Sequence, residues 1–378
     1  MIIGQKEILS ELIKSIDDNR FAHATLIEGL PGYGTLAIAL ELAQYLVCKH
    51  LDQDNASSVI SNSHSKASKF VHPDIHFTFP VVTIPGKERK SVTSVNFLKE
   101  WRTILSQSKY FTIDEWVSTI VKSTARPNIN VTECNQIIQQ LNLQSFEGGA
   151  KVQIIWMANY LGNNGNRLLK LIEEPPENTY IIMINSADGA VINTIRSRCR
   201  VVRLPRIADD DIEQALISLK GVTKTRAKEI SYLAEGNWIT AVEQIDVDNQ
   251  QLFDISIEML ESAQSGDFIR MRSWTEQMDQ LDLMSKKSVL NYGLKLLKEI
   301  MHIRYQHTDL IKIAPQELDR LQRSPIVALI DVNKIGTLSQ ILSETQINLD
   351  RNANSRILLY NSCLLIESIL NGGVMYMN

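Results

Sequence analysis

The sequence has 378 residues, enough for two or three domains, because a single hydrophobic core rarely serves more than roughly 250 to 300 residues. Its apolar share of 44% and charged share of 22% are typical of a folded globular protein, and no apolar run approaches the ~20 residues of a membrane-spanning helix. A net charge of −4 argues against a protein that binds nucleic acid through its overall electrostatic field, although the chain can still contain a local basic patch. The first residues lack the basic-then-apolar pattern of a secretion signal, so we expect a cytoplasmic protein.

The first part of the chain predicts a strand, a glycine-rich turn and a helix. Residues 25–28 are apolar, and the turn Gly29–Gly34 follows them directly. Apolar residues then recur at helical spacing from Leu36 to Cys48. Residues 49–72 are polar and rich in Ser, Asn and Asp, and we expect an exposed loop there.

Three further strands are predicted at residues 151–157, 180–184 and 200–204. Helical patterns lie between them at residues 132–141, where Thr132 is the expected N-cap, and at 166–172, where Pro175-Pro176 ends the helix. Apolar strands that alternate with helices indicate a mostly parallel sheet covered on both faces.

The pattern becomes helical after Pro205. Three carboxylates at Asp209–Asp211 suit a helix start, because the helix dipole favours negative charge there. We therefore predict three domains: an α/β domain over residues 1–205, a small helical lid domain over 206–248, and an all-α C-terminal domain over 249–378.

The glycine turn has the context of a phosphate-binding loop without its chemical groups. A working loop reads G-x-x-x-x-G-K-[ST], in which the lysine reaches the β- and γ-phosphates and the hydroxyl binds Mg²⁺. Here Gly29, Gly32 and Gly34 are present, but Thr35 and Leu36 stand at the lysine and hydroxyl positions. The loop could still hold a nucleotide weakly through backbone amides; the preferred interpretation is that the glycines preserve a strand-to-helix turn.

The second strand lacks the acidic residues that this chemistry needs. P-loop ATPases place an Asp, often followed by Glu, near the end of this strand to bind Mg²⁺ and orient water. The corresponding positions hold Trp156 and Met157, which can neither bind a metal nor move a proton. We therefore expect no hydrolysis and no bound cofactor in this chain.

A series of short motifs resembles a known family. The motifs are, in chain order, Gly4-Gln5, Arg20–Ala24, Gly29–Gly34, Lys151-Val152, Asn166–Lys170, Ile172–Pro176, Thr194–Cys199 and Arg351–Asn354. Their order and spacing are similar to those of the AAA+ clamp-loader subunits of bacterial DNA polymerase III. The degraded nucleotide site beside a retained Ser-Arg-Cys motif resembles the delta-prime type, whereas the delta type usually lacks that motif.

The resemblance implies an AAA+ α/β module with a helical lid, followed by a collar domain that joins other subunits in a pentamer. It also implies that Arg198 is an arginine finger, which enters the ATP site of an adjacent ATPase subunit, with Ser197 and Cys199 in positioning or packing roles. ATP and Mg²⁺ would then bind in neighbouring subunits, and the sliding clamp and primer–template DNA would be met through the complex, with no membrane partner. The alternative is that Arg198 forms a structural salt bridge within its own domain.

Two features depart from that family. Many members carry a four-cysteine zinc module after the first helix, but only Cys48 remains here, and His50, His64, His72 and His76 match no common zinc spacing. We expect no metal, a structural role for His72, and free, mostly buried thiols at the four cysteines, which are Cys48, Cys134, Cys199 and Cys363. Residues 236–238 also contain no arginine that could serve as a second nucleotide sensor.

An aromatic-rich insertion precedes residue 132. Core packing is the preferred interpretation of its aromatic side chains and a partner contact is the alternative; they are Trp101, Tyr110, Phe111 and Trp116.

The function predicted from the sequence is a non-hydrolysing delta-prime-type subunit that supports clamp loading and supplies Arg198 in trans. One rival is an active ATPase subunit of the same complex, which would need turnover by the isolated chain. A second rival is a DNA-binding scaffold unrelated to ATP, which would predict salt-dependent duplex binding by the chain alone.

Overall fold

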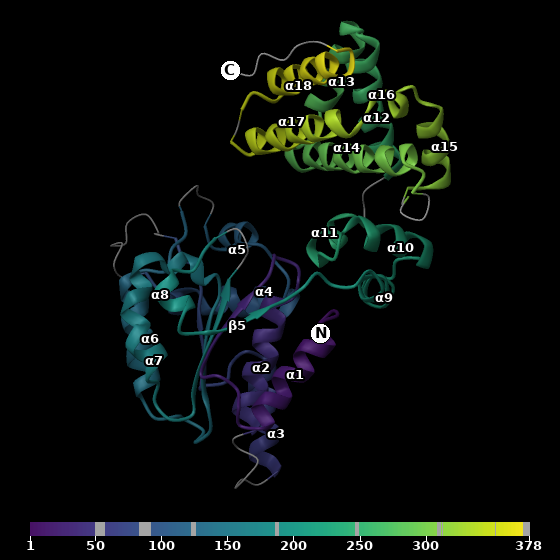
Figure 1. Ribbon diagram of the computed structural model, residues 1–378. Coiled ribbons are helices and arrows are strands. Elements are labelled where there is room, and N and C mark those ends of the chain that lie inside the picture. Colours follow the sequence, from purple (N-terminus) through teal and green to yellow (C-terminus); the bar gives the residue numbers. More distant parts are fainter. Residues whose placement is uncertain are drawn as a thin grey trace. The chain divides into compact units, whose positions relative to one another are not determined.

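The computed structural model describes residues 1–49, 57–82, 92–121, 126–185, 189–245, 249–307, 311, 313–351 and 353–372. The chain separates into two compact units, residues 1–245 and 246–378 (Figure 1). The lid segment belongs to the first unit, so the finer boundary between residues 205 and 206 stays a prediction. Within the described ranges, no helix is both long and apolar enough to span a bilayer.

A five-stranded parallel sheet organises the first unit. Its order is β2-β3-β4-β1-β5, and every neighbouring pair is parallel. The strands are β1 (Ala24–Glu28), β2 (Ile75–Thr78), β3 (Lys151–Ile155), β4 (Thr179–Asn185) and β5 (Arg200–Arg203). The four predicted strands are confirmed, whereas the short edge strand β2 was not predicted.

Helices cover both faces of this sheet, as predicted. Alternate residues of β4 enter different cores, because side chains in a strand point to opposite faces: Ile182 and Ile184 join one cluster, and Ile181 and Met183 join the other. The first cluster includes α1 (Lys6–Asp17) and α2 (Thr35–Lys49). The second includes α6 (Val131–Asn142), η2 (Ala158–Leu168), α7 (Leu169–Glu173) and α8 (Asn193–Arg196) (Figure 1).

Three local predictions were wrong. The segment predicted as a loop over 49–72 contains α3 (Ser57–Ser68). Asn130, not Thr132, caps α6, because its side-chain oxygen accepts the Glu133 N–H at 3.0 Å. The helix predicted over 166–172 is divided between the 3₁₀ segment η2 and the short helix α7.

The segment between β2 and α6 folds as an aromatic layer on the first cluster. It contains η1 (Ser94–Phe97), α4 (Leu98–Gln107) and α5 (Ile113–Ile120). Trp101 and Trp116 are fully buried, and Phe111 is 7% exposed, which confirms core packing for these three. The Trp101 ring stacks on Phe79 at 4.3 Å between ring centroids.

The remaining helices of the first unit form the small lid segment. They are α9 (Asp209–Lys220), α10 (Lys224–Leu233) and α11 (Trp238–Glu243). The predicted acidic start of α9 is confirmed at Asp209–Asp211, and Gly221 ends that helix in the left-handed conformation. Ile212, Ile230 and Trp238 contribute to their common core.

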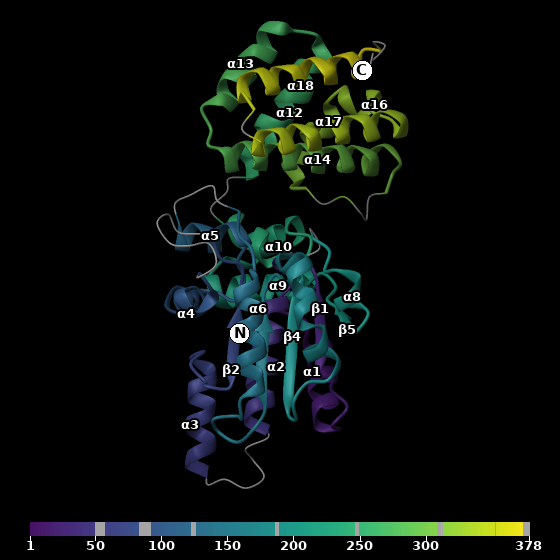
Figure 2. The same cartoon turned by 90° about the vertical axis from the view of Figure 1, so that its left-hand side faces the viewer.

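The second unit is helical throughout its described part, as predicted. Figure 2 shows α12, α14, α17 and α18 packed side by side around one apolar core. Its helices are α12 (Asn249–Ser265), α13 (Phe268–Asp279), α14 (Leu283–Arg304), α15 (Pro315–Arg323), α16 (Ile326–Leu329), α17 (Val332–Asp350) and α18 (Ser355–Leu370).

Candidate functional site

The glycine loop between β1 and α2 keeps the shape of a phosphate-binding turn. Gly32 and Gly34 have φ angles of +90° and +92°, a region that side chains with a Cβ rarely adopt. A Cβ on Gly32 would also lie 1.8 Å from the Asn237 side-chain oxygen. Glycine is therefore required at Gly32 both by the backbone and by the close approach of α11.

The space between the glycine loop, the insertion and the end of β3 is almost completely filled. Its cavity has a volume of about 20 Å³, room for about one water molecule, whereas ligand pockets for small molecules occupy roughly 300 Å³ or more. Thr35 and Leu36 are buried with exposed fractions of 9% and 4%. Among the described residues that line this cavity, Lys109 is the only one with a positive charge.

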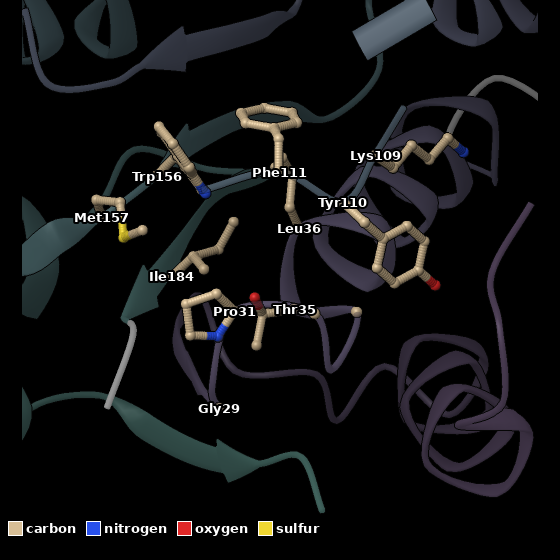
Figure 3. Close-up of a pocket in the computed structure, with 12 residues that line it drawn as sticks. Gly29, Pro31, Thr35, Leu36, Lys109, Tyr110, Phe111, Trp156, Met157 and Ile184 are labelled. Atoms are coloured by element: carbon tan, nitrogen blue, oxygen red, sulfur yellow. The ribbon is translucent and has the colours of Figure 1, made fainter. Parts of the chain in front are cut away.

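Aromatic side chains from the insertion and from the end of β3 occupy the space beside the loop. Figure 3 shows Phe111, Trp156 and Leu36 gathered beside the glycine turn. The rings of Phe111 and Trp156 lie 5.1 Å apart, and Trp156 is also 5.2 Å from Trp101. We name Tyr110, Phe111 and Trp156 the aromatic plug.

Tyr110 anchors the plug to the loop and to the N-terminus. A Cβ on Gly34 would lie 3.4 Å from its phenol oxygen, which accepts the Ile3 N–H at 2.8 Å. Burial raises the pKa of Tyr110 to about 12, so the phenol stays neutral at physiological pH.

The lid segment is fixed directly to the loop. The Asn237 side-chain oxygen accepts the N–H groups of Ile239 and Thr240 at 3.0 and 3.3 Å, and so caps α11. The Trp238 N–H donates to the Gly32 carbonyl at 3.2 Å. These contacts attach α11 to the turn that would otherwise face a nucleotide. Apart from the predicted break at Gly236-Asn237, no sequence pattern indicated these contacts.

Arg198 lies on the surface between α8 and β5, with its side chain 38% exposed. Its Nε donates to the carboxylate of Glu173 at the end of α7, and its Nη1 donates to the Thr194 carbonyl at 2.9 Å. The ion pair within its own domain, which was the alternative interpretation, is therefore present. It leaves the guanidinium partly accessible.

The neighbours of Arg198 in its motif have different environments. Ser197 is exposed, and its hydroxyl donates to the Thr194 carbonyl at 3.3 Å. Cys199 is half-buried, and burial raises the pKa of its thiol to about 11, so the thiol stays protonated and poorly reactive. Arg196 pairs instead with Glu28 at the end of β1.

A second cavity of about 510 Å³ lies beside this pair, at the ends of β1 and β4. Glu28, Asn185 and Arg203 line it, and Arg203 lies 3.5 Å from the Glu28 carboxylate. Sequence reasoning missed Glu28 and Glu173 as partners of the arginines, since neither lies near them in the chain.

The described histidines near the missing zinc module form no metal-binding group. His50 lies outside the described residues, and the described part of the chain contains no group of three or more His, Cys, Asp or Glu suited to a metal. His72 is buried, with Nε2 2.7 Å from the Ser63 hydroxyl, and its Nδ1 accepts the Asp74 N–H at 3.1 Å. Burial lowers the pKa of His72, and its buried hydrogen bonds are compatible with the structural role predicted for it. Cys48, Cys134 and Cys363 are buried free thiols, also as predicted.

A family comparison covers most of the first unit. A family model described as DNA polymerase III, delta subunit, matches residues 4–208, more than half of the chain. This chain belongs to the delta-prime clamp-loader family of DNA polymerase III. The matched range includes the glycine loop, the aromatic plug and Arg198.

Individual relatives of this family are distant. DNA polymerase III subunit delta' of Escherichia coli is 26% identical over 192 residues, which are 50% of this chain and 45% of that protein. The Bacillus subtilis subunit delta' is 23% identical over 214 residues, 56% of this chain and 51% of that protein. The chain therefore spans about half the length of the curated relatives it matches. A gamma subunit-related protein from Thermotoga maritima matches with a TM-score of 0.40 and 14% identity, covering 96% of this chain and 99% of that one.

Proposed function

We propose that this chain is a non-hydrolysing delta-prime-type subunit, which supports ATP-dependent loading of the sliding clamp and supplies Arg198 to a neighbouring subunit. The observation that carries the proposal is the filled cavity at the glycine loop, which has room for about one water molecule. A nucleotide that cannot enter cannot be hydrolysed. The groups that would bind Mg²⁺ and the γ-phosphate are replaced by Thr35, Leu36, Trp156 and Met157.

Arg198 supports the second part of the proposal. A guanidinium directed at a γ-phosphate stabilises the charge that develops during phosphoryl transfer, and in well-studied GTPases such a group accelerates the reaction by roughly 10³ to 10⁵. The filled loop leaves Arg198 no nucleotide of its own. Its partial exposure leaves the side chain free to meet an anion on another subunit.

The same proposal specifies the setting. The chain would work in the cytoplasm within a pentamer of ATPase subunits and delta, in which the second unit forms part of a helical collar. It would meet the sliding clamp and primer–template DNA through that complex. ATP and Mg²⁺ would be held by the neighbours, and the chain would contribute to a DNA polymerase holoenzyme without catalysis of its own.

The experiment is DNA-dependent ATPase activity of the reconstituted clamp loader with Arg198→Ala, with assembly checked by size exclusion. We expect a loss of an order of magnitude or more, because one ATP site loses its trans arginine. Arg200→Ala is the matched control, since Arg200 is an exposed arginine two residues away, and its activity should be unchanged. Full activity of the Arg198 variant in an intact complex would refute the trans role and leave a structural subunit.

Two rivals make different predictions. An active ATPase subunit would hydrolyse ATP as the isolated chain, which the aromatic plug opposes. A DNA-binding scaffold would bind duplex DNA alone with a steep salt dependence, which the net charge of −4 does not favour.

A further inference from the structure

Two of the three nitrogen atoms of the Arg198 guanidinium, Nε and Nη1, are held by groups of its own domain. A guanidinium has five N–H groups in a fixed plane. Nε donates to Glu173, and Nη1 donates to the Thr194 carbonyl at 2.9 Å and lies 3.4 Å from the Ser197 hydroxyl. Within the described part of the chain, no hydrogen bond is formed by Nη2. Nη2 is therefore available to donate to an external anion.

The groups that hold Arg198 are fixed to the core of the first unit. Glu173 is the last residue of α7, whose Leu171 and Ile172 are buried, and the Ile172 carbonyl lies 2.8 Å from His23 Nε2. The Thr194 hydroxyl donates to the Asn166 side chain at 2.9 Å and so connects α8 to η2. Both partners of the guanidinium are consequently carried by packed elements.

Helix stability does not account for a glutamate at this place. The carbonyl groups at a helix C-terminus carry partial negative charge, so a carboxylate there is unfavourable. An ion pair between side chains that are 38% and 47% exposed also contributes little to the stability of the fold. The role of Glu173 is therefore best explained by its contact with Arg198.

We infer that Glu173 is a positioning residue for Arg198, an inference that rests on the proposed trans role of that arginine. A free arginine side chain samples many rotamers, and it must lose this freedom to reach a phosphate in the transition state. Glu173 and the Thr194 carbonyl fix the plane of the guanidinium in advance and leave the N–H groups of Nη2 for an external acceptor. That acceptor is the terminal phosphate group of a nucleotide held by the neighbouring subunit.

The test uses the reconstituted clamp loader with primed DNA and sliding clamp, and compares Glu173→Ala, Glu173→Gln and the control Glu174→Ala. For Glu173→Ala we expect kcat to fall about fivefold, which corresponds to about 1 kcal/mol of activation free energy, while KM for ATP is unchanged. Glutamine should restore most of the activity, because its amide oxygen still accepts from Nε. Glu174 is exposed and adjacent, and its replacement should leave kcat unchanged.

A double variant separates positioning from a general structural effect. If Glu173 acts through Arg198, Arg198→Ala with Glu173→Ala should be no slower than Arg198→Ala alone. A further fivefold loss in the double variant, or unchanged or faster turnover in Glu173→Ala, would overturn the inference. These outcomes differ from failure of the proposed function, in which Arg198→Ala itself has no effect.

Discussion

At the scale of single residues, Gly32 combines two separate demands. Its φ angle of +90° excludes most side chains, and the Asn237 oxygen occupies the volume of a Cβ. Glycine at this position therefore permits both the turn and the contact between the loop and α11. A substitution there should lower the free energy of unfolding by more than backbone strain alone would.

We predict that Gly32→Ala lowers the free energy of unfolding of the first unit by about 3 kcal/mol, made of about 1 to 2 kcal/mol of left-handed strain and a similar term for displaced Asn237. Gly221→Ala is the matched control: its φ is +67° and a Cβ there would meet nothing within 4 Å. Urea unfolding followed by tryptophan fluorescence measures both, since every tryptophan except Trp274 lies in this unit. Equal losses in the two variants would contradict the contact with Asn237.

Part of the candidate site could be predicted from the sequence. Thr35, Leu36, Trp156 and Met157 were identified because they stand at fixed positions relative to the glycine loop and the second strand. The partner of Arg198 could not be predicted, because Glu173 lies 25 residues away in the sequence and only the packing of α7 beside α8 brings it near. A contact between a helix end and a loop 25 residues further along leaves no periodic pattern in the sequence.

At the scale of elements, strands that contain a run of apolar residues were predictable, whereas β2 and α3 were not. β3 and β4 are buried along almost their whole length, and apolar residues form most of each strand. In the edge strand β2 apolar and polar residues alternate over only four positions, so it contains no apolar run, and α3 is built mostly from serine and other polar residues. The aromatic plug could not be predicted from the sequence for a different reason, because it depends on how the insertion folds back onto the loop.

The aromatic plug predicts that restoring the missing loop residues will not restore nucleotide binding. We expect Thr35→Lys with Leu36→Thr to bind ATP–Mg²⁺ no better than wild type, because Phe111 and Trp156 still fill the cavity. Isothermal titration calorimetry measures this directly. Adding Phe111→Ala opens the space and supplies the comparison. Binding at micromolar concentrations by the first variant would show that the lost residues, and not the plug, close the site.

At the scale of the whole molecule, the two units have separate hydrophobic cores. The core of the second unit consists of residues from α12 to α18 and their connections, and includes Trp274, Leu296, Leu342 and Ile366. The cores of the first unit consist of residues before position 246. Each unit exceeds 100 residues, a size at which one core is sufficient for independent folding.

This separation predicts that residues 1–245 and 246–378, expressed apart, will each fold. We expect each piece to unfold cooperatively, at a midpoint close to one of two transitions of the full chain, because neither core borrows apolar residues from the other unit. Circular dichroism and tryptophan fluorescence follow the two pieces, and Trp274 reports the second alone. Midpoints that fall well below those of the full chain would mean that contacts between the units stabilise them. Matching midpoints would show that each unit is stabilised by its own core. The two units would then be linked in one chain for assembly with other subunits and not for stability.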